Sequence, residues 1–186
     1  MNTVEEMGQA EVAAASAVPR MTTQEFLAQL APLAIASAKA TGIPAGFVLG
    51  QGALESGWGN SELSRLGCNL FGVKADAAWH GDTLTMETEE VVDGKHVTVA
   101  ALWRKYANWA DCVNDHAQFF LRNPRYAAAL TLCNGTVADL SVVFTRAIAQ
   151  AGYATDPNYA EGVIAVINSE NLGRYDLPQK QDTPSA

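Results

Sequence analysis

The chain has 186 residues and a mass of 19.7 kDa, which suits one domain of ordinary size with short tails. Hydrophobic residues make up 48% and charged residues 17%, so disorder of the whole chain is excluded. The apolar runs are far shorter than the roughly 18 residues that cross a bilayer, which excludes membrane insertion through a helix. A net charge of −8 and a pI of about 4.8 disfavour a nucleic-acid-binding protein that neutralises phosphates.

Both ends of the chain have the composition of tails. Residues 1–21 are rich in alanine, carry glutamates and lack a periodic apolar face, while residues 178–186 are polar and contain two prolines. We therefore expect mobile tails at 1–21 and 178–186, with the folded domain over residues 22–177. The acidic start also lacks the basic and apolar regions of a Sec signal peptide, so the route of any export is open.

The first expected helix follows Thr22, which forms the pattern of a capping box with Glu25. Apolar residues then recur at helical spacing, which predicts a helix to about Ala40 that ends at Gly42. Pro32 lies inside this segment and is a candidate for a kink.

A second helix should occupy Ala45–Ser56, with Pro44 as its first residue and Gly57 at its end. This segment is apolar on almost every side, and such a helix belongs in the core of the domain. A short helix over Asn60–Leu66 and an ordered loop over Asn69–Lys74 are expected next.

The hydrophobic period then changes to that of a β-hairpin. Thr83–Val92 and Lys95–Trp103 flank the dipeptide Asp93-Gly94, which is typical of a two-residue type I′ turn. Such a turn pairs residues 92 and 95 and thereby sets the register of the whole hairpin.

The remaining elements should be helical, and the fold class is therefore α+β, mainly α. Asp156 and Pro157 are expected to cap and open the last helix. The four expected segments are Trp109–Leu121, Pro124–Leu130, Val137–Ala151 and Pro157–Asn168.

Glu55 is the one carboxylate in the apolar second helix. Desolvation by neighbours such as Leu54 and Trp58 should raise its pKa, and the negative end of the helix dipole acts in the same direction. A carboxylic acid that keeps its proton can donate it to the departing oxygen of a glycoside. The alternative is a glutamate that faces solvent at a frayed helix end.

Glu90 is a second candidate, on the hairpin. The expected register places Glu90 opposite Val97, on the same face as Leu84 and Met86, whereas Glu89 lies on the more polar face. An acid on the more apolar face indicates either a cleft beside the hairpin or a charge that prevents pairing of sheet edges.

Aromatic side chains could provide the flat apolar surfaces on which sugar rings pack. Tyr153 is favoured because a loop before the last helix can hold its phenol in the open. The candidates are Trp58, Phe71, Trp79, Tyr106, Trp109 and Tyr153.

Other chemistries have little support in the sequence. The histidines lack metal-ligand spacing and are expected at the surface or in the core; they are His80, His96 and His116. The cysteines are expected to be buried or free thiols; they are Cys68, Cys112 and Cys133. A nucleophile at Cys68 or Cys112 with His116 stays open, without a local signature.

Four segments together resemble family 73 of the glycoside hydrolases, the bacterial peptidoglycan glucosaminidases. Residues 53–59 resemble the catalytic Ala-Leu-Glu-Ser-Gly-Trp-Gly motif, and residues 69–74 its Asn-x-Phe-x-x-Lys stretch. Residues 123–126 and 151–157 resemble a turn and the closing motif of the family. The segments occur in family order over about residues 22–167, and the likeness is strongest to members that open the wall for the flagellar rod.

This resemblance implies a lysozyme-like fold with a helical body, a β-lobe and a cleft between them. It assigns the general acid to Glu55, the β-lobe carboxylate to Glu90 and the catalytic-site tyrosine to Tyr153. The residues expected to bind substrate are Trp58, Asn69, Phe71, Lys74, Trp79 and Tyr106.

The activity implied is hydrolysis of the β-1,4 bond between N-acetylglucosamine and N-acetylmuramic acid, inside the glycan strand. Glu90 would act as base for water, or would support attack by the acetamido group of the substrate. The alternatives are a lytic transglycosylase and a non-catalytic wall-binding module. The resemblance implies no metal or other cofactor, a monomer in the periplasm, and peptidoglycan and flagellar rod proteins as partners, without nucleic acid.

Overall fold

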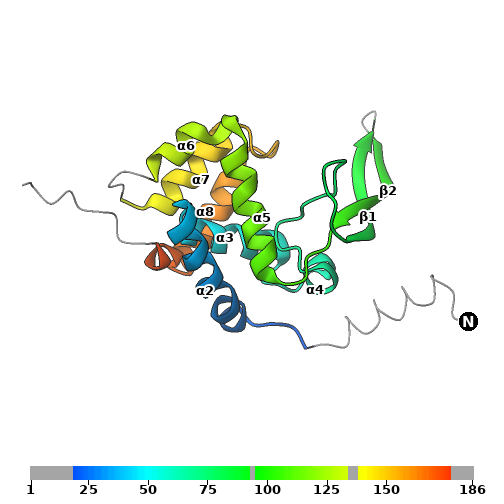
Figure 1. Cartoon of the computed structure of the whole chain (residues 1–186), viewed down its shortest axis with the longest axis horizontal. Helices are drawn as coiled ribbons and strands as arrows, with labels where there is room; N and C mark the ends of the chain where they lie inside the picture. The colour runs from blue at the N-terminus through cyan, green and yellow to red at the C-terminus, as the bar shows by residue number, and fades with distance from the viewer. Residues whose placement is uncertain (1–18, 93–94, 134–137, 177–186) are drawn as a thin grey trace, which may run out of the picture.

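The computed structural model describes residues 19–92, 95–133 and 138–176, and for residues 89–92 and 95–96 the backbone alone. In the described part of the chain, seven α-helices accompany a two-stranded antiparallel hairpin, which projects from the helical body (Figure 1). The fold is therefore α+β and mainly α, as expected. The helices are α2 (Thr23–Thr41), α3 (Ala45–Ser56), α4 (Glu62–Gly67), α5 (Trp109–Arg122), α6 (Ala127–Leu132), α7 (Leu140–Gln150) and α8 (Tyr159–Ser169). The 3₁₀ turns are η1 (Pro124–Tyr126) and η2 (Leu172–Tyr175), and the strands are β1 (Thr83–Val92) and β2 (Lys95–Arg104).

Helix α3 lies at the centre of the helical body, where it contacts α2, α7, α8 and η2. Ten of its twelve residues are buried. A Cβ atom on Gly46 would lie 2.7 Å from the Leu172 carbonyl oxygen, and one on Gly50 would lie 2.7 Å from the Ile167 side chain. The two glycines therefore allow η2 and α8 to approach the backbone of α3.

Local signals set the ends of the first two helices as expected. The Thr22 hydroxyl accepts a hydrogen bond from the Glu25 amide, the Glu25 carboxylate accepts one from the Thr22 amide, and Gly42 ends α2 with φ +80°. Gly57 ends α3 with φ +56°. Pro44 precedes α3 as its N-cap and is not its first helical residue, because its ψ of 133° is extended.

Three later boundaries differ from the expectation. The segment expected as one helix from Pro124 is a 3₁₀ turn followed by α6, and α7 begins at Leu140. Helix α8 begins at Tyr159, two residues after Pro157. The Asp156 carboxylate accepts a hydrogen bond from the Asn158 amide and closes a turn, so the expected cap at Asp156 is wrong.

The hairpin has the expected register, in which Val92 faces Lys95 and Glu90 faces Val97. β2 runs one residue further than expected, to Arg104. The loop before β1 pairs with this last part of β2, because the amides of Ala75 and Arg104 bond across to Leu102 and Val73. The base of the hairpin is thus fixed by a third segment, while the turn at residues 93–94 lies outside the described residues.

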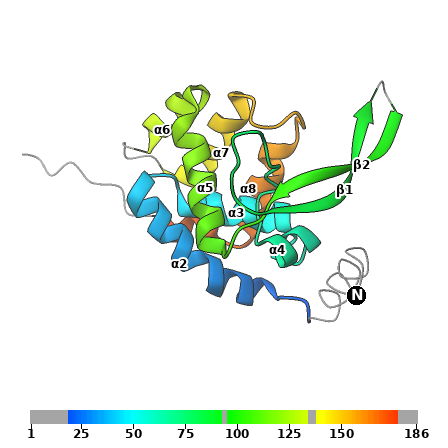
Figure 2. The same cartoon turned by 45° about the vertical axis from the view of Figure 1, so that its right-hand side comes forward.

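The tails expected at both ends fall largely outside the described residues. Among the helices that the structure describes, none is long and apolar enough to cross a membrane. The view turned by 45° shows α5 along the front of the helical body, with the hairpin projecting to the right (Figure 2).

Candidate active site

A cleft of about 370 Å³ opens between α3, α5, the loop after Leu70, the end of β2 and the loop after α7. Glu55 and Tyr153 both line it. A larger hollow of about 790 Å³ lies between α2 and η2, but neither residue lines that one. The complete lining of the cleft is Glu55, Phe71, Gly72, Val73, Lys74, Arg104, Asp115, His116, Phe119 and Tyr153.

Glu55 is placed by the last turn of α3, one residue before the helix ends. Its side chain is accessible to solvent through the cleft, yet the protein atoms that surround it desolvate the carboxyl group. This desolvation raises the pKa of Glu55 above the ordinary value of 4.5. The site therefore offers an accessible carboxylic acid that holds its proton to higher pH than a solvated glutamate does.

Tyr153 enters the same cleft from the loop after α7. Gly152, with φ +80°, turns the chain after α7, and the Tyr153 amide bonds to the Ile148 carbonyl. The phenol is largely surrounded by protein, and burial raises its pKa to about 12, with the charge of Glu55 acting in the same direction. Tyr153 is therefore a neutral hydroxyl at physiological pH.

A buried amide holds the Tyr153 hydroxyl. Gln51, one turn before Glu55 on α3, is fully buried, and its Nε2 lies 2.5 Å from Tyr153 Oη. Gln51 Oε1 lies 2.8 Å from Nε2 of His116 on α5. Three segments of the chain thus meet in one hydrogen-bonded row beneath the cleft.

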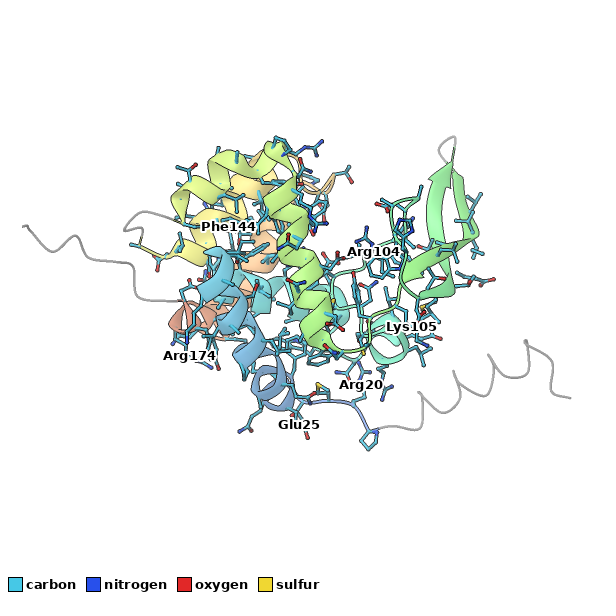
Figure 3. The ribbon with its side chains drawn as sticks, viewed as in Figure 1. Arg20, Glu25, Arg104, Lys105, Phe144 and Arg174 are labelled. Carbon is cyan, nitrogen blue, oxygen red and sulfur yellow. The ribbon has the colours of Figure 1, made fainter. Side chains whose placement is uncertain are left out.

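The hairpin is tied to the helical body by Arg104. Its Nη1 bonds to the Asp115 carboxylate on α5 at 2.7 Å, and its Nη2 to Asp76 at 3.2 Å. The guanidinium also lies 4.7 Å from the centre of the Trp79 ring. Figure 3 shows Arg104 between the hairpin and α5.

The charges along the cleft balance. Two carboxylates, Glu55 and Asp115, and two cations, Lys74 and Arg104, are among its lining residues. The cleft is accordingly less negative than the chain as a whole, which carries a net charge of −8. This balance permits an anionic polymer to approach.

Two of the six residues expected to bind substrate line the cleft. Phe71 is buried and stacks on His116 at 3.8 Å between ring centres, so it forms a wall. Lys74 is exposed, and its ammonium lies 5.5 Å from the Trp103 ring.

The other four lie outside this lining and serve packing in the structure. The Asn69 amide is buried, and it bonds to the backbone of Val73 and Arg104. Buried Tyr106 donates its hydroxyl hydrogen to Asp115, while the Trp79 indole nitrogen donates to the Asp82 carbonyl. Trp58 packs edge-on against Phe26, as Trp109 also packs on that ring.

Glu90 keeps its predicted place in the register, but its side chain lies outside the described residues. Its neighbours at alternate positions, Leu84, Met86 and Thr88, are half-buried, whereas Thr85 and Glu87 are exposed. The backbone alternation therefore puts residue 90 on the more sheltered face of the strand.

Several lining residues were not anticipated. Phe119 is 47% exposed in the cleft although it is aromatic, and it lies beside Tyr153 with 6.0 Å between ring centres. The helical spacing of α5 could have identified Phe119, because it lies off the buried face that carries Val113, His116 and Phe120. Gln51 could also have been noticed, as an amide in an otherwise apolar helix.

The described histidines lie at the surface or in the core, and the cysteines are free thiols, as expected. His116 is a core residue and His80 is exposed. All three cysteines are free, and burial raises the pKa of Cys112 to about 12 and also raises that of Cys68. A raised pKa disfavours the thiolate form of both cysteines, so a cysteine nucleophile is disfavoured.

The sequence model of the glucosaminidase family, described as mannosyl-glycoprotein endo-beta-N-acetylglucosaminidase, matches residues 31–172. This range holds every residue that lines the cleft. The chain belongs to the glucosaminidase family. The resemblance drawn from the four motifs is thereby confirmed.

Individual family relatives agree in sequence and structure. The chain is 39% identical over 146 residues to the peptidoglycan hydrolase FlgJ of Vibrio parahaemolyticus, covering 77% of this chain and 46% of FlgJ. It is 40% identical over 135 residues to the exo-glucosaminidase LytG of Bacillus subtilis, covering 70% and 45%. The chain spans less than half the length of these two relatives.

A solved structure matches most of this chain. The C-terminally truncated glycoside hydrolase domain of Salmonella typhimurium FlgJ superposes with a TM-score of 0.66 at 36% identity, covering 81% of this chain and 98% of that domain. The lysozyme-like glycoside hydrolase fold implied by the motifs is confirmed by this agreement.

Proposed function

We propose that this chain is a peptidoglycan hydrolase that cleaves the β-1,4 bond between N-acetylglucosamine and N-acetylmuramic acid within the glycan strand. The observation that carries the proposal is the place of Glu55, accessible in the cleft beside Tyr153 with a desolvated carboxyl group. Membership of the glucosaminidase family and the likeness to enzymes named peptidoglycan hydrolases support the substrate.

Glu55 acts as the general acid in this proposal. Its proton passes to the bridging oxygen as the bond from that oxygen to the anomeric carbon breaks, and the muramic acid residue leaves as an alcohol. A water molecule adds to the anomeric carbon and loses a proton, which produces a new reducing end at N-acetylglucosamine. Tyr153, neutral at physiological pH, contributes a hydroxyl beside the reacting bond.

The second carboxylate comes from the hairpin. Asp115 also lines the cleft, but its Oδ2 already accepts hydrogen bonds from Arg104 and from Tyr106, and the Arg104 charge offsets its own. We therefore assign the role to Glu90, either as base for water or as support for the oxocarbenium charge during acetamido attack.

Digestion of purified peptidoglycan sacculi tests the general acid. Glu55→Gln should lower the release of soluble fragments by roughly 10²- to 10⁴-fold, the usual loss when a general acid is removed. Glu161→Gln is the matched control, because Glu161 is exposed on α8 and forms a surface ion pair with Arg146. Clearing of sacculi by Glu55→Gln at the wild-type rate would refute the proposal.

Product analysis identifies the bond and the reaction. Mass spectrometry after borohydride reduction should find fragments of several lengths that end in reduced N-acetylglucosamine. Anhydro-muramyl ends would indicate a lytic transglycosylase, and binding to sacculi without release would indicate a wall-binding module. Release of single sugars would show that the enzyme cleaves from the ends of the glycan strand and not within it.

The hairpin carboxylate has its own test. Glu90→Gln should lose roughly 10²-fold or more in turnover, as expected for a lost base or charge-stabilising group. Glu87→Gln is the control, since Glu87 lies on the opposite, exposed face of the same strand. Equal activity of the two variants would remove Glu90 from the mechanism.

A substrate in the cell wall would mean that the proposed activity takes place outside the cytoplasm, in the periplasm for an organism with two membranes.

A further inference from the structure

Gln51 is a fully buried amide in the most enclosed helix of the protein, and both ends of the amide are used. Its oxygen lies 2.8 Å from His116 Nε2, and its nitrogen lies 2.5 Å from Tyr153 Oη. His116 lies 65 positions from Gln51 in the sequence, and Tyr153 lies 102 positions from it. A buried amide with both groups satisfied has one fixed orientation, since reversal would require every partner to reverse.

His116 is held between aromatic rings, with Phe71 stacked on it at 3.8 Å and Phe120 edge-on at 5.0 Å. Complete burial lowers the pKa of His116 to about 3, so the ring is neutral and carries one N–H. Among the described residues, its Nδ1 is buried and has no hydrogen-bond partner.

The unpartnered Nδ1 indicates which ring nitrogen carries the proton. A buried N–H without an acceptor costs more than a buried lone pair without a donor, and it is correspondingly rarer in proteins. The proton therefore belongs on Nε2, where it is donated to Gln51 Oε1. The Gln51 amide group must then donate to Tyr153, and the Tyr153 oxygen must accept.

We propose that His116 and Gln51 are positioning residues that hold Tyr153 as a hydrogen-bond donor toward the cleft. With its oxygen accepting from Gln51, the Tyr153 hydroxyl can direct its own hydrogen only to another acceptor. Glu55 lines the same cleft as Tyr153, and burial together with the charge of Glu55 raises the Tyr153 pKa, so the Glu55 carboxylate or a bound substrate is the acceptor that the cleft offers. The inference rests on the proposed function for the participation of Tyr153 in the reaction.

A double-mutant cycle tests the pathway through Tyr153. Gln51→Met keeps the side-chain volume and removes both hydrogen bonds, and it should lower kcat by about 10-fold or more with KM within about twofold. Tyr153→Phe should lower kcat at least as much. Because Gln51 acts through the missing hydroxyl, Gln51→Met combined with Tyr153→Phe should be no slower than Tyr153→Phe alone. Losses that multiply would overturn the proposal.

A control variant separates positioning from stability. Thr145 is also fully buried, and it bonds within α7 to the Ser141 carbonyl, away from the cleft. Thr145→Val should lower the melting temperature with kcat unchanged. His116→Phe keeps an aromatic ring against Phe71 and removes the donor to Gln51, so it should lower kcat with KM retained. Wild-type kcat in His116→Phe would overturn the role of His116.

The unmodified protein provides a measurement that needs no variant. In ¹⁵N-labelled protein, the histidine nitrogen chemical shifts of His116 should show a proton on Nε2 at neutral pH. A proton on Nδ1 would overturn the inference. Wild-type activity in Tyr153→Phe would also overturn it, whereas wild-type activity in Glu55→Gln would instead refute the proposed function, which keeps the two failures distinguishable.

Discussion

Arg104, the last residue of β2, forms an ion pair with Asp115 of α5 at 2.7 Å, and both side chains are largely covered, with exposures of 17% and 23%. This contact joins the hairpin that carries Glu90 to the helix that forms one wall of the cleft. The pair therefore helps to set the orientation of the hairpin relative to Glu55, together with the loop that pairs with the end of β2.

Asp115→Asn should lower both stability and activity. Losing the charge-assisted bond should cost about 2 kcal/mol of unfolding free energy, and a displaced hairpin should lower kcat/KM by about 10-fold. Denaturant unfolding and sacculus digestion measure the two effects. Arg146→Gln, which breaks the exposed pair between Arg146 and Glu161, should change neither by much. Full activity in Asp115→Asn would show that the pair does not orient the hairpin.

The pH dependence of the rate should report the Glu55 pKa. The acid must be protonated to act, and its pKa lies above the ordinary 4.5. We expect kcat/KM on soluble glycan oligomers to fall as pH rises, with a midpoint above 4.5. Ionic strength should be held constant, because an acidic chain and an anionic substrate repel one another. A falling limb centred at or below the ordinary value would contradict the raised pKa.

Glu55→Gln should stabilise the protein at neutral pH. Desolvation penalises the charged carboxylate only in the folded state, so the wild type loses stability as pH rises from the unfolded pKa through the higher folded pKa. The variant lacks this penalty, and its melting temperature should exceed that of the wild type at pH 7. The difference should vanish below about pH 4, where both states of the wild type are protonated. A lower melting temperature for Glu55→Gln at pH 7 would reverse the sign.

Phe119 should contribute to substrate binding. It is 47% exposed in the cleft and adjoins Tyr153, which suits an apolar platform for a sugar ring. Phe119→Ala should raise KM by about 5-fold, with a smaller change in kcat. Leu121→Ala provides the comparison, because Leu121 is similarly exposed on α5 but does not line the cleft. Equal KM values for the two variants would exclude the platform.

Local interactions explain which parts of the fold could be predicted from the sequence. The capping box at Thr22, the left-handed glycines that end α2 and α3, and the alternation of the hairpin all act within a few residues. The motif around Glu55 is likewise contiguous, so its carboxylate could be proposed as the acid before any tertiary contact was known. The expected cap at Asp156 was wrong because the same local signal also fits a turn, which the amides of Asn158 and Tyr159 close on Asp156.

Tertiary structure alone decided which side chains meet. Gln51, His116 and Tyr153 lie on three different segments, and Arg104 reaches Asp115 only because β2 returns to α5. It also decided the hydrogen bonds of two residues that were expected to bind substrate. Asn69 bonds to the backbone, and Tyr106 bonds to Asp115. Spacing in a sequence fixes the face of a helix or strand, whereas hydrogen bonds between distant segments depend on how whole elements pack.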